Sequence, residues 1–282
     1  MGYKGTLQRT DFGDRMKMLE SGTSDRLMPL VPVLARLDGR SFHSFCKGLR
    51  KPFDPFFGVA MQQTAEWLVR KTGALAGYTQ SDEITLMWFS DDPTSQKVFF
   101  DRRLLKMVSV LASLATVRFN QKFSENWPDF IDPENPPVFD CRVWVVPNKD
   151  EAANSFLWRI EDAKTNSIQA LGQANFSHNR LQGMKNGEIV AALLSEKGIN
   201  WNFLPQQFRF GTFIQRKTVV RPFTHEELER LPKKHEAITN PGLLVERSDV
   251  TTMPMPDFGK VQNRVGVLFN GEAPIMRTET CP

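Results

Sequence analysis

Two acidic segments from separate parts of the chain carry the residue types that a magnesium site needs. Asp38 ends the run RLD and is followed by Gly39, while Asp82 and Glu83 follow Ser81 in GYTQSDE. Two-metal phosphoryl transfer uses carboxylates that converge from different segments, because one ion activates the attacking oxygen and the other steadies the leaving phosphate. Magnesium keeps waters and phosphate oxygens as ligands, so two or three acids suffice. We expect Asp38, Asp82 and Glu83 to form such a catalytic site.

Each acid also has a structural interpretation. Asp-Gly is a common turn dipeptide, so Asp38 can simply begin a turn, and residues 81–83 can be the solvated tip of a hairpin. The segment after Gly39 favours chemistry, because successive backbone N–H groups can wrap a triphosphate while nearby cations neutralise it. Lys51, one of these cations, can equally be an ordinary surface lysine. The expected nucleotide-binding residues here are Arg40, Ser41, Phe42, His43 and Lys51.

The surrounding elements predict that the acids meet. Residues 31–38 are strand-like, and residues 76–89 predict a hairpin with QSDE at its tip. Asp54-Pro55 is a good start for a helix over 55–71. Helical spacing over 96–123 and a strand over 138–146 complete the order strand, helix, hairpin, helix, strand. This order predicts an α+β, ferredoxin-like polymerase palm, an antiparallel sheet with helices on one face, in which the first strand and the hairpin are central neighbours.

The remaining segments predict further elements around this palm. A helix over 11–21, with Met16 and Leu19 as apolar contacts, is expected to pack on the core. We divide the chain into a palm-type core (1–150), a part completing the catalytic domain (151–220) and a C-terminal extension (221–282) of unassigned role. The other predicted elements are a helix at 156–177, a polar loop at 180–187, a helix at 188–196, a strand at 208–220, a helix near 225–231 capped by Thr224 and Glu227, and a mostly irregular tail from 252.

Composition is that of an ordinary soluble globular protein, with 40% hydrophobic and 24% charged residues among 282. The net charge of +4 is a mild indication of an anionic partner and does not identify one. The three cysteines, Cys46, Cys141 and Cys281, lack metal-ligand spacing, so neither a disulfide framework nor a structural zinc is expected. No apolar segment is typical of a signal or a membrane span, and we expect a cytoplasmic protein without a membrane partner.

Four motifs carry a family resemblance when they are taken in order. RLDGRSFHSF, KPFD, GYTQSDE and FDCRVWVVP resemble the tRNA-His guanylyltransferase superfamily, and in particular its bacterial guanylyltransferase-like proteins, over roughly residues 11–217. The resemblance implies a palm that adds nucleotides in the 3′-to-5′ direction to the 5′ end of tRNA. It also implies activation of a 5′-monophosphate by ATP, or use of an existing triphosphate, and assembly as a homodimer or homotetramer.

The resemblance also implies roles for individual residues. Asp38 and Asp82 would hold two Mg²⁺ ions together with the Gly39 carbonyl, and Glu83 would support the second acid. Ser81, Lys51 and the 40–43 backbone would hold the triphosphate of ATP, GTP or another nucleoside triphosphate. Contact with the tRNA 5′ end or a second nucleotide is implied near Lys164, Asn166, Lys185 and Asn186, with helix capping or a solvated loop as the structural alternatives.

One departure bears on the substrate. Enzymes dedicated to tRNA-His carry His-Ile-Asn-Asn after the WR segment, whereas this chain has Lys164, Thr165, Asn166 and Ser167. Replacement of the histidine by Lys164 disfavours strict guanylate addition to tRNA-His. It favours template-dependent repair of 5′-truncated tRNA.

Other functions remain open from the sequence. The enzymatic alternatives are a dedicated tRNA-His guanylyltransferase and a palm-type cyclase or 5′-to-3′ polymerase. A non-enzymatic ferredoxin-like RNA-binding module is a further alternative, although such sheets present aromatic side chains to RNA rather than acids. Cations interleaved with aromatic residues over 208–221 predict either a basic RNA-binding surface or a half-buried amphipathic strand. These residues are Phe208, Arg209, Phe210, Phe213, Arg216, Lys217 and Arg221.

Overall fold

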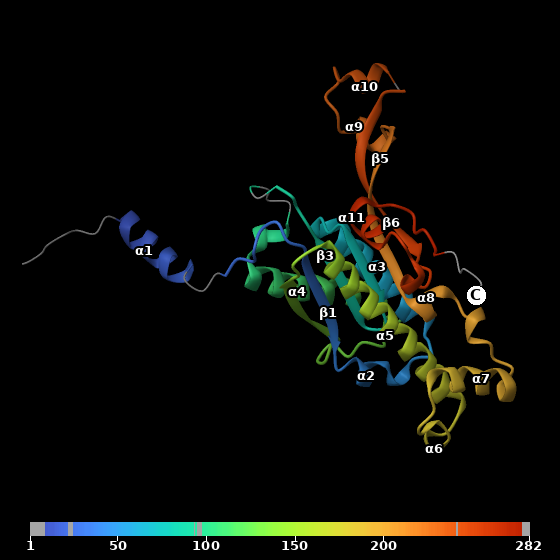
Figure 1. Ribbon diagram of the computed structural model, residues 1–282. Helices are drawn as coiled ribbons and strands as arrows, with labels where there is room; N and C mark the ends of the chain where they lie inside the picture. Colours follow the sequence, from blue (N-terminus) through green and yellow to red (C-terminus); the bar gives the residue numbers. More distant parts are fainter. Residues whose placement is uncertain (1–8, 22–24, 93, 95–97, 241, 278–282) are drawn as a thin grey trace, which may run out of the picture.

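The computed structural model describes residues 9–21, 25–92, 94, 98–240 and 242–277. Their six strands form one antiparallel sheet in the order β4-β1-β3-β2-β5-β6 (Figure 1). The order of the first four strands is the one expected of a ferredoxin-like sheet, and it places β1 beside β3 at the centre. The strands are β1 (Val33–Arg40), β2 (Ala76–Gln80), β3 (Glu83–Trp88), β4 (Val138–Val145), β5 (Thr212–Pro222) and β6 (Leu244–Pro254).

The predicted helices are present with shifted ends. The helices are α1 (Arg9–Ser21), α2 (Phe42–Phe45), α3 (Pro55–Thr72), α4 (Leu104–Ser124), α5 (Lys149–Asn175), α6 (His178–Leu181), α7 (Asn186–Lys197), α8 (Gln206–Phe210), α9 (His225–Glu229), α10 (Glu236–Thr239) and α11 (Arg264–Asn270). Of these, α2, α6, α8, α10 and α11 were not predicted. Short 3₁₀ turns lie at η1 (Cys46–Gly48), η2 (Phe99–Arg102), η3 (Trp201–Phe203) and η4 (Phe258–Lys260). In the part of the chain that the structure describes, no helix has the length and apolar character needed to cross a membrane.

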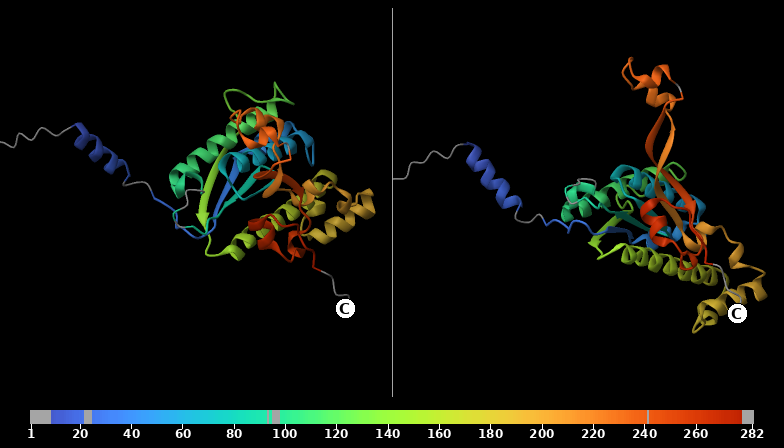
Figure 2. Two further views of the ribbon diagram at one scale, coloured as in Figure 1. Left: turned by 90° about the horizontal axis from the view of Figure 1, so that it is seen from above. Right: turned by 45° about the horizontal axis from the view of Figure 1, so that its top comes forward.

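The expectation of helices on one face of the sheet is wrong, because helices cover both faces (Figure 2). Val33 and Leu37 of β1 join α3 and α4 in one core, whereas Leu34 joins α5 in a second core. Side chains alternate between the faces of a strand, so a strand that is apolar at successive positions needs cover on both sides. The run of apolar residues in VPVLARL was the sequence feature that indicated cover on both faces of β1.

Helix α3 confirms the predicted helix over 55–71 and its start signal. The Asp54 carboxylate accepts hydrogen bonds from the backbone N–H groups of Phe56 at 2.9 Å and Phe57 at 3.0 Å. Pro55 takes the first helical position, where no N–H is needed. The cap fixes where α3 begins, and therefore fixes the loop that carries Lys51.

Two helix predictions need correction. The helix expected over 96–123 begins only at Leu104, because residues 100–102 have positive φ values and form part of η2; Gln96 and Lys97 lie outside the described residues. The first helix, α1, does not pack on the core: Phe12 and Leu19 are 55% and 62% exposed, and α1 stands away from the sheet (Figures 1 and 2). A short apolar stripe predicts a helix without specifying what covers it.

The C-terminal part is more ordered than expected. The tail predicted to be irregular from 252 instead continues β6 to Pro254 and then supplies η4 and α11, whose Phe258 and Val267 are fully buried in the second core. Strand β5 starts at Thr212, because the residues before it form α8. Thr224 and Glu227 form the predicted capping box of α9. The boundaries at 150 and 220 stay a prediction.

Candidate active site

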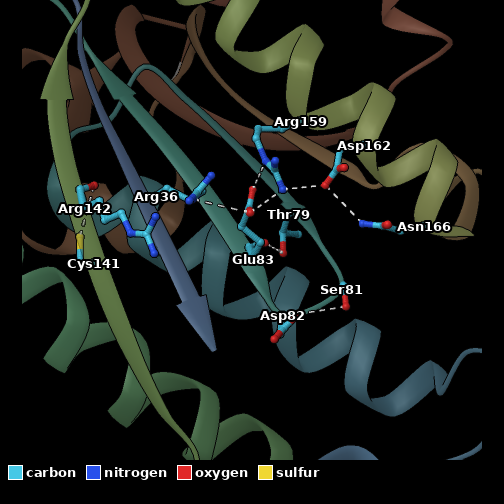
Figure 3. Close-up of polar contacts among 10 residues, drawn as sticks. All are labelled: Arg36, Thr79, Ser81, Asp82, Glu83, Cys141, Arg142, Arg159, Asp162 and Asn166. Carbon is cyan, nitrogen blue, oxygen red and sulfur yellow. Dashed lines mark hydrogen bonds and ion pairs between the residues drawn. The ribbon is translucent and has the colours of Figure 1, made fainter. Parts of the chain in front are cut away.

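The sheet brings the three acids together at one end. Asp38 of β1 lies directly opposite Glu83 of β3. Asp82 occupies the adjoining turn between β2 and β3, next to Glu83 (Figure 3). The Gly39 backbone N–H donates a hydrogen bond to the Asp82 carbonyl at 3.1 Å. Antiparallel pairing of β1 with β3 therefore brings these acids close together, as the sequence predicted. The Gly39–Asp82 hydrogen bond joins the turn after β1 directly to the turn between β2 and β3.

Both turns use a backbone conformation that is uncommon for serine. Ser41 has φ 58° and Ser81 has φ 51°, in the left-handed region. Holding a non-glycine residue there costs on the order of 1–3 kcal/mol, and such residues concentrate at functional sites. These two residues fix the chain on either side of the acids.

Glycine is required at position 39 by close packing. A Cβ there would lie 2.4 Å from the ring of Phe42. That ring is buried and packs against Phe57, Phe119 and Phe139 at centroid distances of 5.0–6.1 Å. The Phe42 side chain thus anchors the loop in the core, and only its backbone is available to a nucleotide.

Asp82 is largely buried, and no cation among the described residues pairs with it. Burial raises its pKa, and the nearby Asp38 carboxylate raises it further, although the Ser81 hydroxyl opposes the shift by donating a hydrogen bond at 3.0 Å. Within the described ranges, neither Asp38 nor Asp82 forms an ion pair. Two adjacent carboxylates without a basic partner are a donor set suited to a divalent cation.

The Glu83 carboxylate forms ion pairs with two arginines. Arg159 of α5 donates to both of its carboxylate oxygens, at 2.6 and 2.7 Å, and Arg36 lies at 3.8 Å (Figure 3). Burial raises the pKa of Glu83, whereas the two guanidinium groups lower it. Among the described residues, no cluster of three or more His, Cys, Asp or Glu side chains could hold a metal. The geometry makes Glu83 the anchor of α5, and its catalytic role stays a prediction.

Sequence reasoning missed the row of α5 side chains that extends from this anchor. Arg159 donates to Asp162 at 3.0 Å, and the Asn166 side-chain amide donates to the same carboxylate at 3.3 Å. The spacing of these residues in WRIEDAKTN places them on one helix face, and this spacing was the available signal. The row leads from Glu83 to Asn166, which was predicted as a binding residue.

A pocket of about 240 Å³ lies beside the turn at Ser81. It brings together Lys51, Ser81 and Asn166 from three separate segments. Phe53 and Phe208 form part of its apolar wall, with parallel rings 4.9 Å apart. A cavity that combines an apolar wall with converging polar groups is a common form of a small-ligand site.

Other predicted site residues lie elsewhere. Arg40 and Ser41 line a separate pocket with Phe130, and the His43 side chain is exposed. Lys164, Lys185 and Asn186 do not line the pocket beside Ser81.

These last three residues make structural contacts. Lys164 pairs with Asp257 at 3.4 Å, Asn186 exchanges hydrogen bonds with Gln169 and Thr165 of α5, and Lys185 precedes the first turn of α7. They join α5 to α7 and to the C-terminal segment. Their predicted contact with the tRNA end stays a prediction.

The contacts of the cations around β5 favour a structural role over a basic surface. Arg216 donates to the carbonyls of Val69 at 2.6 Å and Ala74 at 2.9 Å, and burial lowers its pKa. Arg221 pairs with Glu227 at 2.7 Å. These groups bind the sheet to α3 and α9.

An α+β fold with an antiparallel sheet, paired acids at one end and a pocket beside them is the arrangement expected of a palm-type nucleotidyl-transfer protein. The family model "tRNAHis guanylyltransferase" matches residues 13–147. The chain belongs to this family and is a nucleotidyltransferase.

Solved structures and a curated relative resemble the chain over most of its length. A bacterial tRNA(His) guanylyltransferase-like protein in complex with ATP is 39% identical, with a TM-score of 0.66, covering 73% of this chain and 87% of that chain. A second such structure, in complex with GTP, is 30% identical with a TM-score of 0.66, covering 88% and 94%. The tRNA(His) guanylyltransferase of Schizosaccharomyces pombe is 28% identical over 218 residues, covering 72% and 80%.

Proposed function

We propose that this protein adds nucleotides in the 3′-to-5′ direction to the 5′ end of tRNA, after ATP activates that end. Membership of the family supports the reaction, and the similar bacterial proteins whose structures hold ATP and GTP support the nucleotides. The observation that carries the proposal is the meeting of Asp38 and Asp82 at joined turns, next to the pocket at Ser81. The attacking hydroxyl and the activated phosphate must meet at one place, where the negative charge that develops during transfer is stabilised.

The donor set fits magnesium. Asp38 and Asp82 would hold it with the Gly39 carbonyl, since these two acids are adjacent and have no basic partner among the described residues. When bound, magnesium would neutralise phosphate charge and lower the pKa of a coordinated hydroxyl. The protein's own contribution is to hold the acids on rigid strands.

Nucleotide contacts follow from the pocket and the adjoining loop. The paired rings of Phe53 and Phe208 provide an apolar wall for a base, and Lys51 supplies a cation at the same pocket. Ser81 and Asn166 supply neutral hydrogen-bonding groups. The 40–43 backbone, fixed by the buried Phe42 ring, provides N–H groups for the triphosphate.

We infer template-dependent repair of 5′-truncated tRNA rather than strict guanylate addition to tRNA-His. Lys164 stands where the dedicated enzymes carry histidine, and its ammonium group is held by Asp257 and Glu161. A side chain held in this way does not supply the neutral imidazole that a histidine offers for handling a 5′ end.

Incubation of 3′-labelled tRNA lacking its first nucleotide with ATP, all nucleoside triphosphates and Mg²⁺ tests the proposal. We expect growth at the 5′ end that stops when the acceptor stem is fully paired. Asp38→Ala and Asp82→Ala should each lose at least about a hundredfold in rate. Asp129→Ala is the control and should keep the wild-type rate, because Asp129 is an exposed acid after α4 that lines neither of the pockets described above.

Three outcomes would contradict the proposal or one of its parts. Extension at the 3′ end or formation of a cyclic nucleotide would reject the reaction. Retained addition by pure Asp82→Ala protein would reject the site. Equally efficient addition of an unpaired guanylate to full-length tRNA-His would reject repair in favour of the dedicated activity.

A further inference from the structure

Trp158 is a large aromatic side chain left uncovered on α5. It is 57% exposed, although guanidinium groups stand against its ring: the central carbon of Arg159 lies 4.6 Å from the ring centroid and that of Arg36 lies 5.8 Å away. Cations at these distances are attracted to the face of an indole ring. The ring is therefore accessible, while the two guanidinium groups beside it are largely buried and paired with Glu83.

The two arginines are held next to the acids. Arg159 donates both to Glu83 and to Asp162, and Arg36 pairs with Glu83 (Figure 3). Glu83 is the strand partner of Asp38 and the sequence neighbour of Asp82. The arginines that contact the Trp158 ring are thus held by Glu83, which neighbours both Asp38 and Asp82. The ring therefore lies close to the predicted reacting centre.

This side of the acids is open, whereas the other side is a pocket. Asp140 and Arg142 of the edge strand β4 lie on the same sheet face as Asp38 and are exposed. The pocket at Lys51 and Ser81 lies between α3 and the part of α5 from Asn166 to Ala170, beyond the position of Trp158. Nucleotide transfer needs two substrates at one centre, so the enclosed side suits a mononucleotide and the open side suits the end of a polymer.

We propose that Trp158 is a stacking platform for the nucleobase of the 5′-terminal nucleotide of the RNA. This inference rests on the proposed function. Stacking on an aromatic ring accepts every base, because every base has a π-face. Such a platform fits an enzyme that extends RNA ends of differing sequence.

Equilibrium binding tests the platform without turnover. The affinity of 3′-fluorescein-labelled, 5′-truncated tRNA is measured by anisotropy without nucleotides, for the wild type, Trp158→Ala, Trp158→Phe and Phe203→Ala. Phe203 is the matched control, because it is 86% exposed and lies in η3. We expect about tenfold weaker binding for Trp158→Ala, most of the affinity kept by Trp158→Phe, and no change for Phe203→Ala.

A second RNA isolates the stacking. A tRNA of the same length with an abasic 5′-terminal nucleotide should bind wild type about tenfold more weakly and should bind Trp158→Ala with the same affinity as wild type. A tenfold loss that persists on the abasic RNA would overturn the proposal, since it would mean that Trp158 acts on protein structure or on another part of the RNA. Unchanged tRNA affinity in Trp158→Ala would also overturn it.

Kinetics show whether the base that stacks on Trp158 belongs to the tRNA or to the incoming nucleoside triphosphate. If Trp158→Ala raises the KM for the nucleoside triphosphate and leaves tRNA affinity unchanged, the ring serves the incoming nucleotide and the proposal is wrong. A wild type that binds tRNA through Trp158 but adds no nucleotide would reject the proposed function and leave the platform standing. Normal nucleotide addition, with tRNA binding that does not depend on Trp158, would reject the platform and leave the proposed function standing.

Discussion

At the scale of single residues, the site combines acids that repel each other with a backbone held in uncommon conformations. Asp38 raises the pKa of Asp82, and burial raises it more. Ser41 and Ser81 hold positive φ values on either side of these acids. Each feature costs folding free energy, and each is understandable if the loops and carboxylates are shaped for a charged ligand.

Asp82→Asn should stabilise the metal-free protein by about 1 kcal/mol at neutral pH, because it removes a buried charge and its repulsion with Asp38. The fold raises the pKa of Asp82, so the stability contributed by its protonated form is complete below the ordinary value of 3.8 and is lost as pH rises through the raised value. The advantage of the variant should therefore vanish as pH falls toward 3.8. Urea unfolding in EDTA across this pH range measures it.

Magnesium should reverse that ranking. At ten times its dissociation constant a ligand of the folded state adds about 1.4 kcal/mol, so Mg²⁺ should raise the melting temperature of the wild type and leave Asp82→Asn unchanged. Asp129→Asn is the control and should respond as the wild type does, because Asp129 is an exposed acid that lines neither pocket. Equal stabilisation of all three proteins would place the ion elsewhere.

Lys51→Met should weaken ATP binding about tenfold, since one charge-assisted contact to phosphate is lost while the apolar stem is kept. Lys47→Met provides the comparison, because Lys47 is exposed on η1 and does not line the pocket. Calorimetric titration with ATP and Mg²⁺ gives both affinities. Equal affinities would return Lys51 to the role of a surface lysine.

At the scale of elements, α5 is joined to the sheet by a polar anchor as well as by its apolar face. The side chains of Glu83 and Arg159 are 12% and 14% exposed, and their bidentate contact lies between the turn of the hairpin and the middle of α5. The row Arg159, Asp162 and Asn166 then continues to the pocket. The orientation of α5 therefore sets the distance between the acids and the residues that α5 contributes.

Glu83→Gln and Arg159→Met should each cost about 2–3 kcal/mol of unfolding free energy, because each removes the bidentate contact and leaves a largely buried charge with only its weaker partner, Asp162 or Arg36. The double variant should cost clearly less than the sum, with a coupling of about 2 kcal/mol. Denaturant unfolding of the four proteins measures the cycle. Additive effects would mean that the contact does not hold α5 to the sheet.

At the scale of the whole molecule, the C-terminal segment completes the second core. Strand β6 pairs with β5 over its full length, and Phe258, Val261 and Val267 are fully buried beside α5. The outer ends of β5 and β6, with α9 and α10, project from the body (Figure 1). The last third of the sheet thus has a buried part that supports α5 and an outer part that does not contact the acids.

Truncation after Pro254 should remove roughly 5–10 kcal/mol of apolar burial, which is comparable to the whole stability of a domain. We expect loss of cooperative unfolding. Truncation after Arg277 is the control and should leave the transition unchanged, since these buried side chains remain. A cooperative transition in the shorter protein would show that the first core folds without the second.

Much of this protein was determined by local sequence. Asp54-Pro55 started α3, Thr224 with Glu227 capped α9, and strand-forming residues on either side of the polar QSDE turn defined the hairpin that carries Asp82. These signals are short-range, because caps and turns depend on neighbouring backbone groups. The pairing of β1 with β3 followed from the order of elements, and with it came the meeting of Asp38 and Asp82.

Tertiary structure decided what each polar side chain faces. Sequence could not show that Glu83 would be occupied by Arg159, that Lys164 would pair with Asp257, or that Trp158 would stay exposed. These contacts join residues far apart in the chain, and the packing of α5 on a second face of the sheet selects them. The acids could therefore be identified from the sequence. The burial and the charged neighbours that set the role of each acid could not, because they arise only when distant segments pack together.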